Sequence, residues 1–584
     1  MKALSLLIVL LIARGLVLAG KDVPLSVWSP LAFLWQDLLI VLIFAFIEAI
    51  ARRAWISWLI YGLIVLYTAL NVPLERLLAS PLTWTMMRAA RGTLADSIAH
   101  YFTWWNFTLI AAIAAAGFFV PKALQHRRVS SSQMALPLLV IVAIGPWAAR
   151  LVETNGLHRN AVVTLMTGWQ PRVAPSHSEQ DWRRTPLSTE PSADLQWLQR
   201  SLSGRNVILV MLESTGADHL KLYGAKNDPT PNLTALARHA LIFDSAYAVY
   251  PESIKGLFSV LCSQYPAIDT RAEIYERIGN PSLPEIYRSL GYRTALFHSG
   301  RFMYLGMEEI IRARGYEKLA DAGEIGGNHN SSFGVDEPAT VGAILHWLDC
   351  LDPREHFFLT YLPIAGHHPY QSPEMGPFPE RDDIGRYRNA LYYGDQALGV
   401  LIEGLKKRGR FENTVFVMVG DHGEAFGQHE GNYGHTLFIY EENVRVPMFI
   451  AAPGVWAEPR RVSGVASLVD VAPTVLDLMG IERPKHFQGE SLLMASPRMA
   501  LFYTDYSLGW LGLRDAEWKF IYEIESARSY LFNLKADPGE VENLSWQFSE
   551  RCRIYAGHLK LWSAAQRAAV LRGTNLFSFN RHSL

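Results

Sequence analysis

The first 152 residues contain five long apolar stretches separated by short polar connections. They cover residues 3–19, 31–50, 55–72, 102–120 and 134–152. Each is close to the roughly 17–25 residues that a membrane-spanning helix needs. The first stretch also fits a cleavable signal peptide, because Lys2 precedes an apolar run that ends in LVLAG. The four further stretches predict a multi-pass anchor with either interpretation of the first.

Basic residues fall in alternate connections of this region and predict its orientation. Positively charged loops usually face the cytoplasm, so five crossings would place everything after Val152 on the periplasmic or extracellular side of a cytoplasmic membrane. The residues that set this orientation are Lys2, Arg52, Arg53, Lys122, Arg127 and Arg128.

The connection over residues 73–101 departs from this pattern because it carries arginines on the outer side. Its length and its sequence SPLTWTMMRAARG predict a helix that lies at the membrane surface, with tryptophans at the interface. The residues concerned are Arg76, Arg88, Arg91, Trp84, Trp104 and Trp105.

Two acidic residues, Asp37 and Glu48, lie at or within the second apolar stretch. Ionisable groups inside a span usually face a protein interior or water. Near the end of a span they can instead reach the membrane surface. The sequence leaves both interpretations open.

After residue 152 the pattern changes to that of a globular α/β protein. Residues 153–204 are rich in Pro, Ser and charge, and predict a connector that lies along the globular domain. Over residues 205–500, apolar strands such as NVILVMLE and TVFVMVG alternate with helical patterns, which predicts a mostly parallel sheet covered on both faces. Residues 501–584 contain short strand patterns such as WKFIYEI and predict a small C-terminal antiparallel subdomain and tail.

Composition excludes two classes of protein. The 54 basic and 55 acidic residues leave no basic surface for a nucleic acid, so none is expected as a partner. The three cysteines, Cys262, Cys350 and Cys552, are too few and too scattered for a metal knuckle or a disulfide framework, and they allow one bridge at most.

Acidic and imidazole side chains follow two of the predicted strands. Glu213 ends NVILVMLE, and Asp421 and His422 directly follow TVFVMVG. The carboxyl ends of neighbouring parallel strands meet at one edge of a sheet, where open α/β sheets bind ligands. A mixed carboxylate and imidazole set suits Zn²⁺ or Mn²⁺ better than a thiolate-preferring metal. The alternative is that these residues end separate strands and only cap them.

A serine, Ser253, precedes the helical pattern IKGLFSVLC. The amino terminus of a helix favours an anion, and a nearby divalent cation would lower the pKa of a hydroxyl further, so Ser253 is a candidate nucleophile. A serine at the start of a helix is also a common capping residue.

These segments resemble, in order, the motifs of the sulfatase branch of the alkaline phosphatase superfamily. The resemblance covers residues 206–545 and rests on NVILVMLESTGADHLKLYG, TPNLTALARHALIFDSAYA, YPESIKGLFSVLCSQYP, GDHGEAFGQHE, YEENVRVPMFIAAPG, SLVDVAPTVLDLMGI and LFNLKADPGEVENLS. The five-stretch anchor ahead of it resembles that of lipoteichoic acid synthases and phosphoethanolamine transferases of the same branch.

The resemblance implies roles for individual residues. Glu213, Asp421 and His422 match metal ligands, and Ser253 matches the nucleophile, which also contacts the metal. Three histidines match positions that bind or protonate the substrate: His367, with His368 as the alternative, stands near the transferred group, and His435 matches the basic position ahead of YEE. His298 matches a residue that lines the pocket.

Departures from the family pattern bear on the reaction. Sulfatases carry Cys-x-Pro-x-Arg at the nucleophile, which is converted to formylglycine, whereas this chain reads SIKGL from Ser253 to Leu257. Ser214 stands where sulfatases have a second Asp, which puts a calcium site of four carboxylate and amide ligands in doubt. The low cysteine count departs from the disulfide-rich phosphoethanolamine transferases.

The resemblance therefore implies a metal-dependent, membrane-anchored transferase. It would move a phosphoglycerol- or phosphoethanolamine-type group from a phospholipid to an envelope glycan or lipid through a covalent Ser253 intermediate, using one divalent ion (Mn, Zn, Mg or Ca). His367, His435 and Lys255 would bind phosphoryl oxygens or protonate the leaving group. A membrane-bound sulfatase or phosphate-ester hydrolase is the alternative enzyme, and a catalytically silent membrane scaffold is the alternative from another class.

Overall fold

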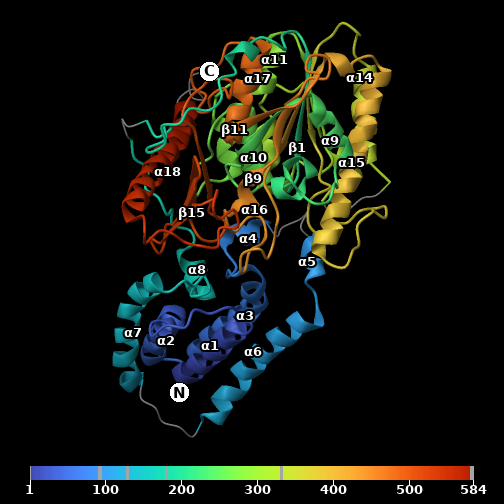
Figure 1. Cartoon of the computed structure of the whole chain (residues 1–584). Helices are drawn as coiled ribbons and strands as arrows, with labels where there is room; N and C mark the ends of the chain where they lie inside the picture. The colour runs from blue at the N-terminus through green and yellow to red at the C-terminus, as the bar shows by residue number, and fades with distance from the viewer. Residues whose placement is uncertain (1, 90–94, 126–130, 178–180, 329–332, 579–584) are drawn as a thin grey trace.

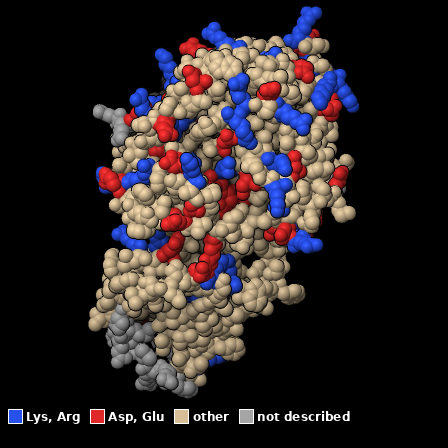
Figure 2. All heavy atoms as spheres, viewed as in Figure 1, with Lys and Arg blue, Asp and Glu red and all other residues tan. Residues whose placement is uncertain are grey.

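A computed structural model describes residues 2–89, 95–125, 131–177, 181–328 and 333–578. It consists of a lower body of long helices and an upper body built on a large sheet (Figure 1). In the same view, acidic and basic side chains are spread over the upper body and are sparse on the lower one (Figure 2). This contrast is typical of an apolar anchor joined to a water-exposed domain.

Helices form at all five predicted apolar stretches. They are α1 (Lys2–Leu18), α2 (Ser29–Ile50), α3 (Ala54–Leu78), α6 (Trp104–Ala123) and α7 (Ser131–Leu151). Within the described residues, α2, α3 and α6 are long and apolar enough to cross a membrane by length and composition. The helix α1 has 17 residues, and the apolar part of α7 runs over Leu138–Leu151. Three helices, rather than the expected five, therefore meet this criterion.

The connection between α3 and α6 lies between the two bodies. It contains α4 (Trp84–Ala89) and α5 (Ala95–His100), whose labels stand at the junction in Figure 1. Arg91 of this connection lies outside the described residues. The same holds for Arg127 and Arg128 after α6.

A buried charge cluster holds the anchor helices together. The guanidinium of Arg14 in α1 lies 2.8 Å from Asp37 of α2 and 3.3 Å from Glu75 of α3. Asn160, beyond α7, donates to Asp37 at 2.7 Å. Asp37 therefore faces the protein interior, which is the first of the two interpretations that the sequence left open. Glu48 accepts from the backbone amide of Ala3 at 3.2 Å, at the opposite end of α1 from the upper body.

The main sheet of the upper body is mostly parallel. Its strand order is β11-β2-β10-β6-β1-β5-β3-β4, with β9 paired to β2. Within it, β10 runs antiparallel to β2 and β6, and β9 antiparallel to β2. The strands are β1 (Asn206–Leu212), β2 (Ala240–Tyr247), β3 (Arg293–His298), β4 (Lys318–Ala320), β5 (Phe357–Leu362), β6 (Thr414–Gly420), β9 (Arg445–Val446), β10 (Met448–Ala451) and β11 (Arg460–Ser467).

Helices cover both faces of this sheet because side chains along each strand alternate between two cores. In β1, Leu209 packs with α10 (Ser253–Cys262), α11 (Leu283–Ser289) and α17 (Val471–Met479), whereas Val210 packs with the other face. That face is covered by α9 (Pro231–Leu236), α14 (Glu337–Asp349) and α15 (Asp383–Lys407). Shorter elements are α8 (Ala161–Thr167), α12 (Met307–Ile311), α13 (Ala322–Ile325), α16 (Glu441–Val444), β7 (Ala425–Phe426) and β8 (Tyr433–Gly434).

The carboxyl-terminal part adds an antiparallel sheet and a helix. The sheet comprises β12 (Met499–Thr504), β13 (Trp510–Asp515), β14 (Trp518–Glu523) and β15 (Ser529–Asn533). Its antiparallel order confirms the expectation drawn from the short strand patterns. The helix α18 (Ser549–Ser578) packs on β13 and β14 and was not predicted, because its apolar positions are interrupted by charged ones.

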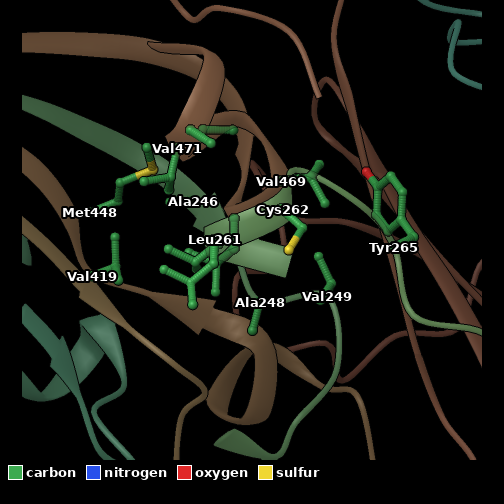
Figure 3. Packing of buried hydrophobic residues seen from close by; sticks show 14 of the residues in the cluster. Ala246, Ala248, Val249, Leu261, Cys262, Tyr265, Val419, Met448, Val469 and Val471 are labelled. Carbon is green, nitrogen blue, oxygen red and sulfur yellow. The ribbon is translucent and has the colours of Figure 1, made fainter. Parts of the chain in front are cut away.

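Every residue of the helix α10 after Ser253 is buried. Figure 3 shows Leu261 and Cys262 of α10 among Val469, Val471 and Met448, all of them buried. This packing fixes the axis of α10 and hence the position of its first residue, Ser253.

Candidate active site

The tips of β1 and β6 bring Glu213 and Asp421 together. The two strands are parallel and in register, with Leu212 opposite Gly420, so the next residue of each strand emerges at the same edge. A carboxylate oxygen of Asp421 accepts from the backbone amide of Ser214 at 2.9 Å. The predicted convergence of these strand ends is therefore present in the structure.

His422 completes a compact set of three buried side chains. Its Nε2 lies 3.6 Å from Glu213 Oε1 and 3.4 Å from Asp421 Oδ2. One donor atom from each residue lies within 4.8 Å of the others. His422 Nδ1 lies 2.9 Å from the carbonyl oxygen of Gly423, which can only accept, so Nδ1 carries the proton. Neutral His422 therefore turns the lone pair of Nε2 toward two carboxylates.

This donor set fits a divalent cation. Burial, and then the charge of Asp421, raise the pKa of Glu213 to about 7, and burial raises the pKa of Asp421 to about 6. Burial lowers the pKa of His422 to about 4. Among the described residues, no Lys or Arg forms an ion pair with either carboxylate. Two buried carboxylates and an imidazole lone pair aimed at one point are the ligand types of Zn²⁺ and Mn²⁺ sites.

Ser253 lies against this set at the first position of α10. Its hydroxyl donates to Glu213 Oε2 at 2.8 Å and lies 3.5 Å from His422 Nε2. The side chain that caps α10 belongs to Glu252, which accepts from the amide of Ile254 at 3.4 Å. Ser253 is therefore not the capping residue, and its hydroxyl is directed to the acidic cluster.

A second histidine, His435, stacks on His422 with ring centroids 4.0 Å apart. Its Nδ1 lies 2.7 Å from Glu424 Oε2, and Glu424 also accepts from the hydroxyl of Tyr370. Burial opposes a charge on His435, but the carboxylate of Glu424 outweighs it and raises the pKa of His435 to about 9. His422, Glu424 and His435 also form a second group with metal-ligand spacing.

His367 and His368 lie in the loop after β5. The ring of His367 is 6.5 Å from that of His435. His367 Nδ1 lies 2.6 Å from the carbonyl oxygen of His368, so this nitrogen carries the proton and Nε2 is an acceptor. Burial lowers the pKa of His367 to about 3, so the ring is neutral near pH 7.

Two of the predicted site residues have other partners. The ammonium group of Lys255 lies 3.4 Å from Asp505 and 4.1 Å from the ring centroid of Tyr250. His298 is buried, and its Nδ1 donates to the carbonyl of Leu362 at 3.0 Å. Neither residue makes a contact with Ser253 or the Glu213 cluster among the contacts of the described residues.

Glu424 is the site residue that the sequence analysis missed. It is fully buried three positions after Asp421, in the segment GDHGE. A carboxylate so close to two candidate ligands was the available signal, because a histidine in a polar site usually has a carboxylate or carbonyl partner.

Two family models match parts of the upper body. The family described as Sulfatase matches residues 205–481, and the family described as N-sulphoglucosamine sulphohydrolase, C-terminal, matches residues 429–554. Residues 205–481 form a sulfatase-family domain. The upper body accordingly has the alkaline-phosphatase-like sulfatase fold.

Individual relatives of the sulfatase domain come from both reaction types. The chain is 25% identical over 315 residues to the lipoteichoic acid synthase-like protein YvgJ of Bacillus subtilis (strain 168), covering 50% of each chain. It is 32% identical over 212 residues to arylsulfatase K of Bos taurus, covering 32% of this chain and 38% of the relative. The chain thus spans about half the length of these curated relatives, or less.

Among solved structures, an alkaline phosphatase superfamily protein from Vibrio parahaemolyticus superposes with a TM-score of 0.56 at 18% identity. The superposition covers 69% of this chain and 98% of that one. At this identity the likeness supports the fold of the upper body and says nothing of substrate.

Proposed function

We propose that this enzyme transfers a phospho-linked group, of phosphoglycerol or phosphoethanolamine type, from a phospholipid to an envelope glycan or lipid. The observation that carries the proposal is Ser253, which donates to Glu213 beside the metal-ligand set at the start of a buried helix. A serine in this place, without the Pro and Arg of the sulfatase signature, remains a hydroxyl nucleophile.

The apolar helices of the anchor support a donor molecule that is itself a membrane lipid. These helices adjoin the sulfatase domain, and the outer connections of the anchor touch loops that carry site residues: Glu430 accepts from the backbone amide of Asp22 at 2.8 Å. We further propose that all five apolar helices cross a cytoplasmic membrane and that the sulfatase domain stands on its outer side. The headgroup of a phospholipid would then lie next to the site while its chains remain in the bilayer.

Glu213, Asp421, His422 and the Ser253 oxygen would hold one divalent ion, which lowers the pKa of an adjacent hydroxyl and neutralises charge on phosphoryl oxygens. Glu213 orients Ser253 Oγ through its hydrogen bond. The His422 tautomer, fixed by Gly423, keeps Nε2 free as a ligand.

Two histidines divide the proton transfers. In the first step Ser253 gives its proton to Glu213 Oε2, the oxygen to which its hydroxyl donates, Oγ bonds to phosphorus, and the bond from phosphorus to the diacylglycerol oxygen breaks. Protonated His435, held by Glu424, donates its proton to the departing oxygen. In the second step the acceptor hydroxyl gives its proton to His367 Nε2, its oxygen bonds to phosphorus, the bond to Ser253 breaks, and Oγ takes its proton back from Glu213. Exchange with solvent then restores the starting protonation states.

A second function, a sulfatase or phosphate-ester hydrolase, is favoured by a different observation. The arylsulfatase K relatives have the higher identity, 32% in the bovine protein against 25% in YvgJ, although over a shorter part of the chain. With the same residues, water in place of the acceptor hydroxyl would release the group as a free ester or ion.

Intact-protein mass spectrometry separates the two functions. The detergent-solubilised full chain is incubated with vesicles of phosphatidylglycerol and phosphatidylethanolamine and quenched in acid, beside a Ser253→Ala control. We expect a mass increment on Ser253 that matches the headgroup and is absent from the control. Ser253 oxidised to formylglycine would establish the sulfatase, and an unmodified Ser253 with every lipid would remove the support for transfer.

A further inference from the structure

A segment of the anchor reaches the candidate active site. His100 ends α5 and Tyr101 follows it, in the connection between α3 and α6, and both contact His368 of the sulfatase domain. The rings of Tyr101 and His368 are stacked, with centroids 5.7 Å apart and planes 5° apart, and the Tyr101 hydroxyl lies 3.3 Å from His368 Nε2. In Figure 1, α5 lies beneath the lower end of α15, between the two bodies.

This contact belongs to the site rather than to a remote interface. His368 directly follows His367, and its ring lies 5.2 Å from that of Tyr370, whose hydroxyl donates to Glu424. Glu424 in turn binds His435, which stacks on His422. A continuous set of side chains therefore joins the anchor residue Tyr101 to the metal-ligand set.

The loop that carries His435 also rests on the anchor. Glu430 accepts from the backbone amide of Asp22, just beyond α1. A Cβ at Gly431 would lie 3.1 Å from the Cβ of Ala79, just beyond α3. Both loops that supply site histidines thus contact connections between the apolar helices.

The surroundings of Tyr101 point to the membrane surface. Tyr101 keeps 36% of its surface exposed, and the aromatic residues that follow it are more exposed still: Phe102 at 68%, Trp104 at 87% and Trp105 at 62%. Exposed aromatic rings at the start of an apolar helix are typical of the headgroup level of a bilayer. Tyr101 therefore lies between that level and the histidines of the site.

We infer that His100 and Tyr101 form the membrane-side wall of the substrate site and position the phosphodiester headgroup of a bilayer lipid. A tyrosine hydroxyl and two imidazoles offer donors for phosphate oxygens, whereas an apolar wall would offer none. The inference rests on the proposed function for the nature of the transferred group. It adds that the anchor supplies part of the substrate site, so that recognition of a lipid requires residues a soluble substrate does not use. Tyr101 is on this account a positioning residue.

The test compares two substrates of one enzyme. The full chain, in vesicles of phosphatidylglycerol and phosphatidylethanolamine, is assayed for release of diacylglycerol and, separately, for hydrolysis of water-soluble bis(4-nitrophenyl) phosphate. The variants are Tyr101→Ala, Tyr101→Phe and His368→Ala. Phe102→Ala is the matched control, because Phe102 is the neighbouring exposed ring and contacts Phe107 of α6.

We expect Tyr101→Ala to lower kcat/KM for the lipid about 10-fold, mainly through KM, the size of effect produced by losing one hydrogen bond to a charged group. The soluble phosphodiester should change by less than about 2-fold. Tyr101→Phe, which keeps the stacked ring, should recover part of the loss, His368→Ala should reproduce it, and Phe102→Ala should behave as the parent enzyme.

Other outcomes separate this inference from the proposed function. If Tyr101→Ala is neutral toward the lipid, or lowers both substrates equally, the inference is wrong while lipid cleavage by the parent enzyme leaves the proposed function standing. If the parent enzyme cleaves the soluble ester and no lipid, the proposed function is wrong, and the inference that rests on it is wrong as well.

Discussion

Two groups of buried acidic side chains, one in each body of the molecule, are balanced in different ways. In the anchor, Asp37 and Glu75 share the guanidinium of Arg14, whose remaining donors bind backbone carbonyls such as that of Arg159 at 2.9 Å. At the strand tips, Glu213 and Asp421 face the lone pair of His422. The first group carries its own cation, and the second leaves its negative charge directed at one point.

A third acidic residue shows that this difference does not follow from burial alone. Asp505 is as buried as Glu213, and burial by itself would raise its pKa. Lys255 and Arg172 overcome that effect and hold the pKa of Asp505 below its ordinary value. Where a buried acidic residue has a structural role, as Asp505 does, the fold places a basic side chain beside it. Among the described residues, Glu213 and Asp421 form no ion pair with a Lys or Arg, which is the arrangement expected where a metal ion supplies the positive charge.

The largest expected effect comes from removing one of the unbalanced carboxylates. Glu213→Gln should abolish binding of the divalent ion and lower turnover by on the order of 1,000-fold, because the nucleophile loses its charge stabilisation and its hydrogen bond. Metal analysis of the purified protein and steady-state assays measure both. Glu482→Gln, at an exposed position, is the control for the chemical change. Normal metal content in Glu213→Gln would show that this group is not the ion site.

Breaking the balanced group should cost stability. Arg14→Met leaves Asp37 and Glu75 buried without a cation, and loss of one partner of such a cluster costs about 3–5 kcal/mol of unfolding free energy. Thermal unfolding in detergent measures the loss. Replacing all three residues together by apolar ones should recover most of it. A single variant as stable as the parent would mean that the cluster is hydrated and contributes little.

The pair of Lys255 and Asp505 tests the same contrast with pH. Asp505→Asn leaves a buried ammonium group without its anion and should cost about 2 kcal/mol at neutral pH. Because the pKa of Asp505 is below its ordinary value of about 4, this contribution is complete above that pH and is lost as the pH falls below it. Unfolding of the parent and the variant, measured from about pH 7 to about pH 3, should therefore converge at the acid end. A constant difference across that range would contradict the ion pair.

The strand-tip residues were predictable because their positions follow from local rules. An apolar run of strand length ends at Glu213, another ends before Asp421, and parallel strands deliver their ends to one edge. The apolar stretches of the anchor were predictable for the same reason. Whether each stretch crosses the membrane also depends on how its helix packs against the neighbouring helices, which composition does not reveal.

Other features depend on packing between distant segments. Lys255 was expected beside the transferred group because it follows Ser253 by two positions, but two positions along a helix turn a side chain through roughly 200° and send it to the opposite face. There it meets Asp505, a residue 250 positions away in the chain. The contact of Tyr101 with His368 joins residues 267 positions apart, and no local sequence pattern predicts it.

The smallest expected effect comes from Glu424. Its carboxylate balances the positive charge of His435, whereas in the anchor the guanidinium of Arg14 balances two carboxylates. Glu424→Gln should lower turnover about 10- to 30-fold, because the proton donor loses the carboxylate that keeps it charged. Tyr370→Phe removes the other hydrogen bond to Glu424 and keeps the charge of Glu424, so it should lower turnover less.

Metal content decides between two origins of the effect. Unchanged metal content in Glu424→Gln means that His435 itself is the cation at this position, whereas the loss of one of two bound ions means that His422, Glu424 and His435 hold a second metal. Unchanged turnover would show that His435 is not the proton donor.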